Sequence, residues 1–273
     1  MMINKVWAVY FSATGTTKKV TEYVANAISE KIDAPIDTVD FTIPDARKRS
    51  LEFGKDDLVV FGTPVYAGRV PNVLLSFLNE NIKADNTCSI PIVVYGNRNY
   101  DDALKELIRI LNNDGFEIIA AGAFVGEHAF SKVLAAGRPD ESDMLLAEEL
   151  AEKAAKRICL SDNKPVEILC FKDEKSLRPY YQPKDNNGTA INILKVKPKT
   201  NDNCNKCGLC AKICPMGSIS YEDQSNILGI CIKCGACIKK CPVEAKFFDD
   251  KGYLYHKKDL EMTYTRRSEP EIF

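Results

Sequence analysis

The sequence predicts a two-part protein, in which an α/β domain with a doubly wound parallel sheet precedes a small α+β domain rich in cysteine. Two observations support this prediction. Short apolar runs alternate with helical patterns over residues 1–160, and such alternation is typical of parallel strands joined by right-handed crossovers. Eight of the eleven cysteines lie within residues 204–241, which sets the C-terminal part apart from the rest.

The elements of the first part follow one another in a regular order. The predicted strands are five largely apolar runs, at residues 5–11, 35–41, 57–66, 89–97 and 117–126. Apolar residues at helical spacing predict helices over about residues 20–32, 71–82, 101–113 and 140–159. In a doubly wound sheet, ligands bind where the strands end and the strand order reverses. We therefore expect the binding site in the loops after the first, third and fourth strands.

The composition favours a soluble globular protein. The chain has 273 residues, of which 45% are hydrophobic, so it can bury one large core or two ordinary ones. Its formal net charge of −1 gives no reason to expect nucleic acid or an acidic membrane surface as a partner. No apolar run reaches the roughly 18 residues of a membrane span, and the first residues lack a signal-peptide layout. We expect a cytoplasmic protein.

The first of the three loops is rich in hydroxyl groups. Its candidate anion-binding residues are Ser12, Thr14, Gly15, Thr16 and Thr17. Gly15 permits a tight turn in which backbone N–H groups converge, and the following helix directs its positive dipole end at the same point. Neither a P-loop nor a dinucleotide-binding glycine pattern is present in this stretch. A well-capped helix, with Thr14 or Thr16 as N-cap, is the simpler alternative, but it uses one hydroxyl rather than four.

The second and third loops each present a tyrosine. The candidate binding residues of the second loop are Pro64, Val65, Tyr66, Ala67 and Gly68. Those of the third loop are Gly96, Asn97, Arg98, Tyr100 and Asp101. Aromatic side chains beside backbone amide groups offer a planar heteroaromatic ligand both stacking faces and hydrogen bonds. A single loop tyrosine is usually a packing residue, but two such loops beside an anion site favour a ligand.

The three loops together resemble those of flavodoxins. The stretches SATGTT, TPVYAGRVP and GNRNYDDAL are similar, in order and spacing, to the phosphate loop and the two flavin-flanking loops of that family. The similarity covers about residues 3–160, and it implies a five-stranded sheet in the order 2-1-3-4-5 with FMN as the cofactor. It also implies that the FMN phosphate lies at residues 12–17 and the isoalloxazine ring between the loops around Tyr66 and Tyr100.

One histidine follows the fifth predicted strand. His128 could approach the edge of a flavin at which a hydride or a proton arrives, which makes it a candidate catalytic residue. The alternative is a loop histidine that makes a local hydrogen bond. Both interpretations stay open at this stage.

The second part of the chain contains a duplicated cysteine motif. CNKCGLCAKICP begins at Cys204 and CIKCGACIKKCP at Cys231, so the pattern C-x2-C-x2-C-x3-C-P recurs with an offset of 27 residues. Three thiolates at this spacing hold one iron–sulfur cubane, whereas the fourth binds the other cluster. The predicted ligands of one [4Fe–4S] cluster are Cys204, Cys207, Cys210 and Cys241. Those of the second are Cys214, Cys231, Cys234 and Cys237.

Other uses of these cysteines fit the pattern less well. Zinc sites usually take two CxxC pairs with longer intervening loops. Disulfides are rare in cytosolic chains. The remaining cysteines are predicted to be small buried hydrophobic residues rather than ligands, namely Cys88, Cys159 and Cys170.

The chain therefore divides into four predicted segments. These are a flavodoxin-like FMN-binding domain at 1–160, a connecting or docking segment at 161–200, a 2[4Fe–4S] ferredoxin domain at 201–250 and a tail at 251–273 that packs back. The connecting segment is too long for a plain linker in a compact protein. We expect Tyr180 and Tyr181 to pack between the domains.

The whole chain resembles the EFR1-type ferrodoxins, in which an N-terminal flavodoxin-like domain is fused to a clostridial-type two-cluster ferredoxin. The similarity extends to residues 134–143 and 178–181. It implies an anaerobic source. Clostridial-type ferredoxins tend to be acidic, whereas residues 204–250 hold six lysines and five acidic residues. This balance weakens the case for a partner with a positively charged surface.

A flavin and iron–sulfur clusters in one chain favour an electron relay. FMN accepts two electrons and passes them on singly, and each [4Fe–4S] cluster carries one. We expect an electron carrier that acts between partner redox proteins. The alternative is an FMN-dependent reductase, in which the clusters feed the flavin and a small organic acceptor is reduced near Tyr66, Tyr100 and His128. Direct oxidation of NAD(P)H, a redox-sensing role and a homodimer stay open.

Overall fold

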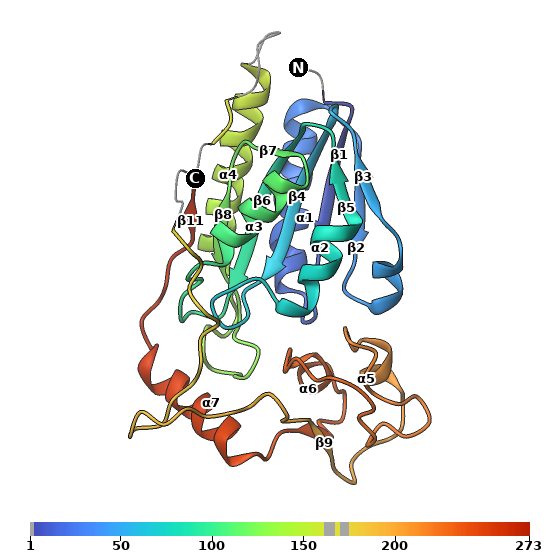
Figure 1. The fold of residues 1–273 in the computed structure, drawn as a ribbon, viewed down its shortest axis with the longest axis vertical. Helices are drawn as coiled ribbons and strands as arrows, with labels where there is room; N and C mark the ends of the chain where they lie inside the picture. The colour runs from blue at the N-terminus through green and yellow to red at the C-terminus, as the bar shows by residue number, and fades with distance from the viewer. Residues whose placement is uncertain (1–2, 161–166, 170–174) are drawn as a thin grey trace.

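The computed structural model describes residues 3–160, 167–169 and 175–273 (Figure 1). Its centre is a parallel sheet formed by β1 (Lys5–Tyr10), β2 (Ile36–Asp40), β4 (Asp57–Pro64), β6 (Thr87–Tyr95) and β8 (Gly122–Val125). These strands pair in the spatial order β2-β1-β4-β6-β8. The predicted order 2-1-3-4-5 is thus confirmed.

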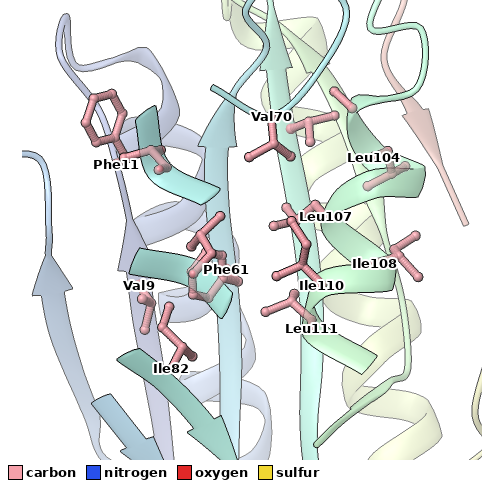
Figure 2. Packing of buried hydrophobic residues seen from close by; sticks show 14 of the residues in the cluster. Val9, Phe11, Phe61, Val70, Ile82, Leu104, Leu107, Ile108, Ile110 and Leu111 are labelled. Atoms are coloured by element: carbon pink, nitrogen blue, oxygen red, sulfur yellow. The ribbon is translucent and has the colours of Figure 1, made fainter. Parts of the chain in front are cut away.

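Helices cover both faces of this sheet. α1 (Thr16–Ile32) and α4 (Glu141–Cys159) pack on one face, and α2 (Leu75–Asn81) and α3 (Ala103–Asn113) on the other. Successive side chains of a strand point to opposite faces, so Ala8 lies in one apolar cluster and Val9 in the other. Figure 2 shows the apolar cluster that contains Val9, in which the apolar side of α3 faces Phe61 and its neighbours.

Smaller elements complete the first domain. The predicted helix over 71–82 begins as the 3-10 helix η2 (Asn72–Leu74) and continues as α2, and another 3-10 helix, η1 (Pro44–Lys48), follows β2. β3 (Leu51–Phe53) and β5 (Ile82–Ala84) form a separate parallel pair. The predicted strand over 117–126 divides into β7 (Phe116–Ile118) and β8, which both pair with β6.

The C-terminal tail adds a strand that the sequence does not predict. β11 (Glu271–Ile272) pairs antiparallel with β8, with Glu271 opposite Ala123. Before it, α7 (Lys251–Thr263) leads from the cysteine-rich part back toward the sheet. The tail therefore crosses the edge of the first domain next to the loops that follow β6 and β8.

The cysteine-rich part contains two short helices, α5 (Leu209–Lys212) and α6 (Ala236–Lys239), and the antiparallel pair β9 (Lys199–Thr200) and β10 (Lys246–Phe247). It lies beyond the carboxyl ends of the parallel strands (Figure 1). Among the described residues, no helix is long and apolar enough to cross a membrane.

The three cysteines outside the duplicated motif have different environments. Cys88 is fully buried in β6, as predicted. Cys159 is exposed, so its predicted burial is wrong. It is the last residue of α4, one position beyond Ile158, the last buried residue of that helix. Cys170 lies outside the described residues.

Candidate functional site

The loop between β1 and α1 forms an open anion cradle. Gly15 is the N-cap of α1 in a left-handed conformation with φ of 109°, and no side chain caps the helix. The first turn carries no acidic residue, and a Cβ atom placed on Gly15 would have nothing within 4 Å. The positive end of a 17-residue helix thus faces a space that an anion can enter.

The hydroxyl groups of this loop have different roles. Ser12 Oγ accepts a hydrogen bond from the Lys18 N–H at 3.0 Å, which closes the loop on the helix. The Ser12 N–H donates to Thr42 Oγ1 at 2.8 Å. Thr16 faces Gly126 at the end of β8, where a Cβ atom would come within 3.2 Å of Thr16 Cβ. The alternative of a helix capped by Thr14 or Thr16 is not observed, because the N-cap is Gly15 and no side chain caps the helix.

The second loop makes a tight turn after β4. Tyr66 and Arg69 exchange two backbone hydrogen bonds of 2.9 and 3.1 Å, and Ala67 and Gly68 between them both have positive φ, at 52° and 76°. This is the pattern of a type I′ turn. A Cβ atom on Gly68 would lie 2.3 Å from Asp101 Oδ2, so only glycine permits the close approach of the second loop to the third.

The third loop is held by the C-terminal tail. The Asn97 side-chain amide donates to the carbonyl oxygens of Tyr264 and Arg266, both at 2.8 Å, and its oxygen accepts from the Ser268 N–H at 3.1 Å. Tyr100 donates from its hydroxyl to Glu271 at 2.8 Å, and burial, followed by this bond, raises the Tyr100 pKa. Asn97 therefore positions the loop, and its side-chain amide is already occupied.

The segment 178–181 contacts both the second and the third loop. Arg178 donates three hydrogen bonds to Asp102, one of 2.6 Å from its backbone N–H and two of 2.7 and 3.1 Å from its guanidinium. The guanidinium bonds are the main cause that lowers the Asp102 pKa to about 2. Tyr180 donates from its hydroxyl to Val70 O at 2.8 Å. The Tyr181 N–H donates to Ala67 O at 2.8 Å, and the Arg98 guanidinium lies 4.3 Å from the Tyr181 ring. Residues 178–181 thereby hold the two loops together.

His128 packs directly against the third loop. A Cβ atom on Gly96 would lie 2.4 Å from His128 Cδ2. The ring nitrogen Nδ1 accepts a hydrogen bond from the Phe130 N–H at 3.1 Å. This is the local hydrogen bond expected of a loop histidine without a catalytic role. Burial, followed by the charges of Lys239 and other nearby cations, lowers the His128 pKa to about 3. The ring therefore stays neutral at physiological pH.

The low pKa of His128 predicts a pH-dependent stability. The unfolded histidine binds a proton below its ordinary pKa of 6.5, whereas the folded one binds it only near 3. Between these values the unfolded state holds more protons, so the free energy of unfolding falls as pH falls, by up to about 1.4 kcal/mol per pH unit. His128→Asn should flatten this slope between about pH 6.5 and pH 5. Urea unfolding followed by fluorescence of Trp7, the one tryptophan, measures it. If the pH dependence of the free energy of unfolding were the same in the variant, His128 in the folded protein would take up its proton near its ordinary pKa.

The eight motif cysteines surround two cavities. One cavity, the inner cluster site, is lined by Cys214, Cys231, Cys234 and Cys237. The other, the outer cluster site, is lined by Cys204, Cys207, Cys210 and Cys241. Each set joins three cysteines of one motif to the last cysteine of the other, the grouping expected from the sequence. Among the described residues, no group of three or more His, Cys, Asp or Glu side chains is placed to hold a single metal ion.

The backbone around the two sites repeats with the sequence. Gly208 and Gly235 have φ of 73° and 74°, and each precedes a short helix. The Ser218 N–H donates to Cys214 Sγ at 3.4 Å, and the equivalent Ala245 N–H donates to Cys241 Sγ at 3.2 Å. Backbone donors aimed at sulfur stabilise thiolate ligands. The residues at both sites fit an iron–sulfur cluster, as those after β1 fit a phosphate.

The inner cluster site adjoins the second loop, which follows β4. Cys234 and Ala236 are buried in the same apolar cluster as Val70, and Tyr66 packs against it. The phenol of Tyr66 lies within electrostatic reach of Cys231 and Cys234, and burial is the main cause of its raised pKa. A Cβ atom on Gly235 would lie 2.4 Å from Ala129 O. The two domains are thus in direct contact here.

Two cations also join the domains at this contact. Arg47 donates to the carbonyl oxygens of Phe41 and Thr42 in the first domain and to that of Pro215, next to Cys214, at 2.6 Å. Lys239 donates to His128 O at 2.7 Å. None of these contacts was apparent from the sequence, because they join residues far apart in the chain.

Comparison with known families agrees with this architecture. Residues 8–103 match the sequence model of a flavodoxin domain, and residues 198–220 and 227–247 match that of a 4Fe-4S binding domain. No curated protein matches the chain.

Solved structures with a similar arrangement include several flavodoxins. An archaeal flavodoxin is 15% identical, with a TM-score of 0.43, and the match covers 57% of this chain and 99% of that one. A flavodoxin from Streptococcus pneumonia TIGR4 is 19% identical, with a TM-score of 0.40, and the match covers 56% and 98%. The two-electron reduced flavodoxin from Megasphaera elsdenii is 19% identical, with a TM-score of 0.38, and the match covers 55% and 98%.

The two matched domain types, together with the fold and the cysteine sites, define an electron-transfer protein that uses FMN and iron–sulfur chemistry. The protein is a flavodoxin–ferredoxin fusion, with the flavodoxin domain at the N-terminus and the 4Fe-4S domain at the C-terminus.

Proposed function

We propose that the protein is an electron carrier that relays electrons between two [4Fe–4S] clusters and FMN for partner redox proteins. One observation carries the proposal: Cys234 of the inner cluster site is buried in the apolar cluster against which Tyr66 of the second loop packs. FMN supplies exchange between two-electron and one-electron chemistry when it is bound. A cluster beside a flavin loop suits such exchange, since no partner needs to dock between them.

The residues that would hold FMN are those of the three loops after β1, β4 and β6. The cradle at Ser12–Thr17 would bind the phosphate through the N-terminal N–H groups of α1. Tyr66 and Tyr100 would flank the ring system, with Tyr100 held by Glu271. Residues 178–181 would keep the second and third loops at a fixed separation. FMN binding would then require less ordering of these loops.

The outer cluster site is the proposed point of exchange with a partner. Cys207 is exposed, whereas Cys234 of the inner site is buried. Three exposed lysines lie close in sequence to the outer cysteines, namely Lys206, Lys212 and Lys240. These charges suit a partner redox protein with an acidic surface, which would be attracted at low ionic strength.

A flavin reductase is the second candidate function, and the environment of His128 bears on it. The histidine lies against Gly96 of the third loop, where a substrate would approach the flavin. Its pKa of about 3 makes it a poor proton donor near neutral pH. Protein partners at the cluster domain therefore account for more of the observed features than a small organic acceptor does.

An anaerobic visible spectrum of the purified protein tests the proposal. We expect bound FMN and about eight iron atoms per chain. NADH and NADPH should leave the flavin bands unchanged, and a reduced low-potential ferredoxin should bleach them. Bleaching by a nicotinamide alone would favour the reductase. Protein without iron or flavin would overturn the proposal as a whole.

A further inference from the structure

The two halves of the duplicated motif differ at a buried position. The fifth residue after the last cysteine of each motif is Ile219 in the first half and Lys246 in the second, 27 residues apart. Both are buried, with exposed fractions of 5% and 3%. A buried lysine in place of a buried isoleucine requires a reason, because an ammonium group is costly to remove from water.

The two residues line different cluster sites. Ile219 lines the inner site, with Cys214, Cys231, Cys234 and Cys237. Lys246 lines the outer site, with Cys204, Cys207, Cys210 and Cys241. One cluster would therefore have an apolar side chain beside it where the other has a positive charge.

The ammonium group of Lys246 has neutral hydrogen-bond partners. Its Nζ donates to Thr200 Oγ1 at 2.7 Å and to the Gln224 carbonyl oxygen. Within the part of the chain that the structure describes, no carboxylate oxygen lies within ion-pair distance of it. Asp223 is in electrostatic reach, but it is exposed. Protein groups thus orient the ammonium without neutralising it.

The cysteine ligands provide the negative charge that the hydrogen-bond partners of Lys246 do not. Lys246 lies within electrostatic reach of Cys210 and also of Cys237. A [4Fe–4S] cluster held by four thiolates carries a net negative charge, which increases by one on reduction. A buried cation beside it stabilises the reduced form more than the oxidised form, because the interaction grows with the charge of the cluster.

We propose that Lys246 is the counter-charge of the cluster at the outer site, and that it raises the reduction potential of that cluster. Lys206 and Lys233 occupy equivalent positions in the two halves, so they give both clusters a similar charge and no difference in potential. Lys246 has no such counterpart. The proposal rests on the two-cluster function above, and it gives the relay a site at which an electron from a partner is held.

The test is a potentiometric titration of both clusters, followed by electron paramagnetic resonance. In Lys246→Met, the ratio of reduced to oxidised outer cluster at a fixed potential should fall about tenfold, which is 59 mV for a one-electron couple. The inner cluster should shift less. Lys246→Arg keeps the charge and should restore the wild-type potential. Lys240→Met removes an exposed charge next to Cys241, and solvent screening should make its effect much smaller.

The reciprocal variant covers the case in which Lys246→Met does not retain its clusters. Ile219→Lys places an ammonium beside the inner cluster and should raise the potential of that cluster instead. Unchanged potentials in Lys246→Met, or in Ile219→Lys where the first variant is lost, would overturn the role of Lys246. A wild-type protein that binds no iron would overturn the proposed function instead, so the two failures are distinguishable.

Discussion

A Cys241→Ser variant is expected to lose the cluster whose other ligands are Cys204, Cys207 and Cys210, and to keep the second cluster. The reason is geometric, since Cys241 lines the cavity of the first three cysteines, although it belongs to the other motif. Serine is a poor ligand for iron in place of a thiolate. Iron per chain should fall by about half, to about four atoms. Iron analysis with electron paramagnetic resonance of the reduced protein measures this.

Cys214→Ser is the matched control for this experiment. Cys214 occupies the equivalent position in the first motif and lines the inner site. The variant should lose the inner cluster and keep the outer one, so that the two variants lose different resonances. Loss of the inner cluster in Cys241→Ser would contradict the exchange of ligands between the motifs.

The parts of the molecule that the sequence predicts are those with local patterns. The strand at 57–66 follows from a continuous apolar run and the helix at 140–159 from apolar residues at helical spacing. The strand order follows from the resemblance of three loops. The cysteine grouping follows from spacing alone. At the end of α4 this approach fails, because Cys159 lies one residue past the buried stripe of the helix and so turns outward.

The parts that the sequence does not predict depend on contacts between distant residues. β11 has two residues, too few for any periodicity, and the chain just before it is held by hydrogen bonds to Asn97 and Arg138. The Asn97 side chain therefore ties the tail to the third loop. The tail also presents Glu271 to Tyr100, so a segment without a motif contributes to the candidate site.

The contact between the domains gives the second prediction with a large effect. In Gly235→Ala, electron transfer from the inner cluster to the flavin should be markedly slower than in the wild-type protein. The new methyl group would lie 2.4 Å from Ala129 O, so the backbone of one domain must shift away from that of the other at this contact. Such overpacking costs about 2 kcal/mol, in addition to about 1 kcal/mol for a non-glycine residue at positive φ. Separation moves Cys234 away from Tyr66. Stopped-flow bleaching of the flavin by reduced ferredoxin measures the rate.

The duplicated motif contains its own control for this variant. Gly208 has the same conformation, with φ of 73° against 74° at Gly235, but a Cβ atom there would have nothing within 4 Å. Gly208→Ala therefore introduces the same backbone strain without the collision. Its flavin should bleach at close to the wild-type rate, provided that both variants retain their iron. If both variants slowed flavin bleaching equally, the cause would be strain in the cluster loops. The contact between the domains would then not be the route of electron transfer.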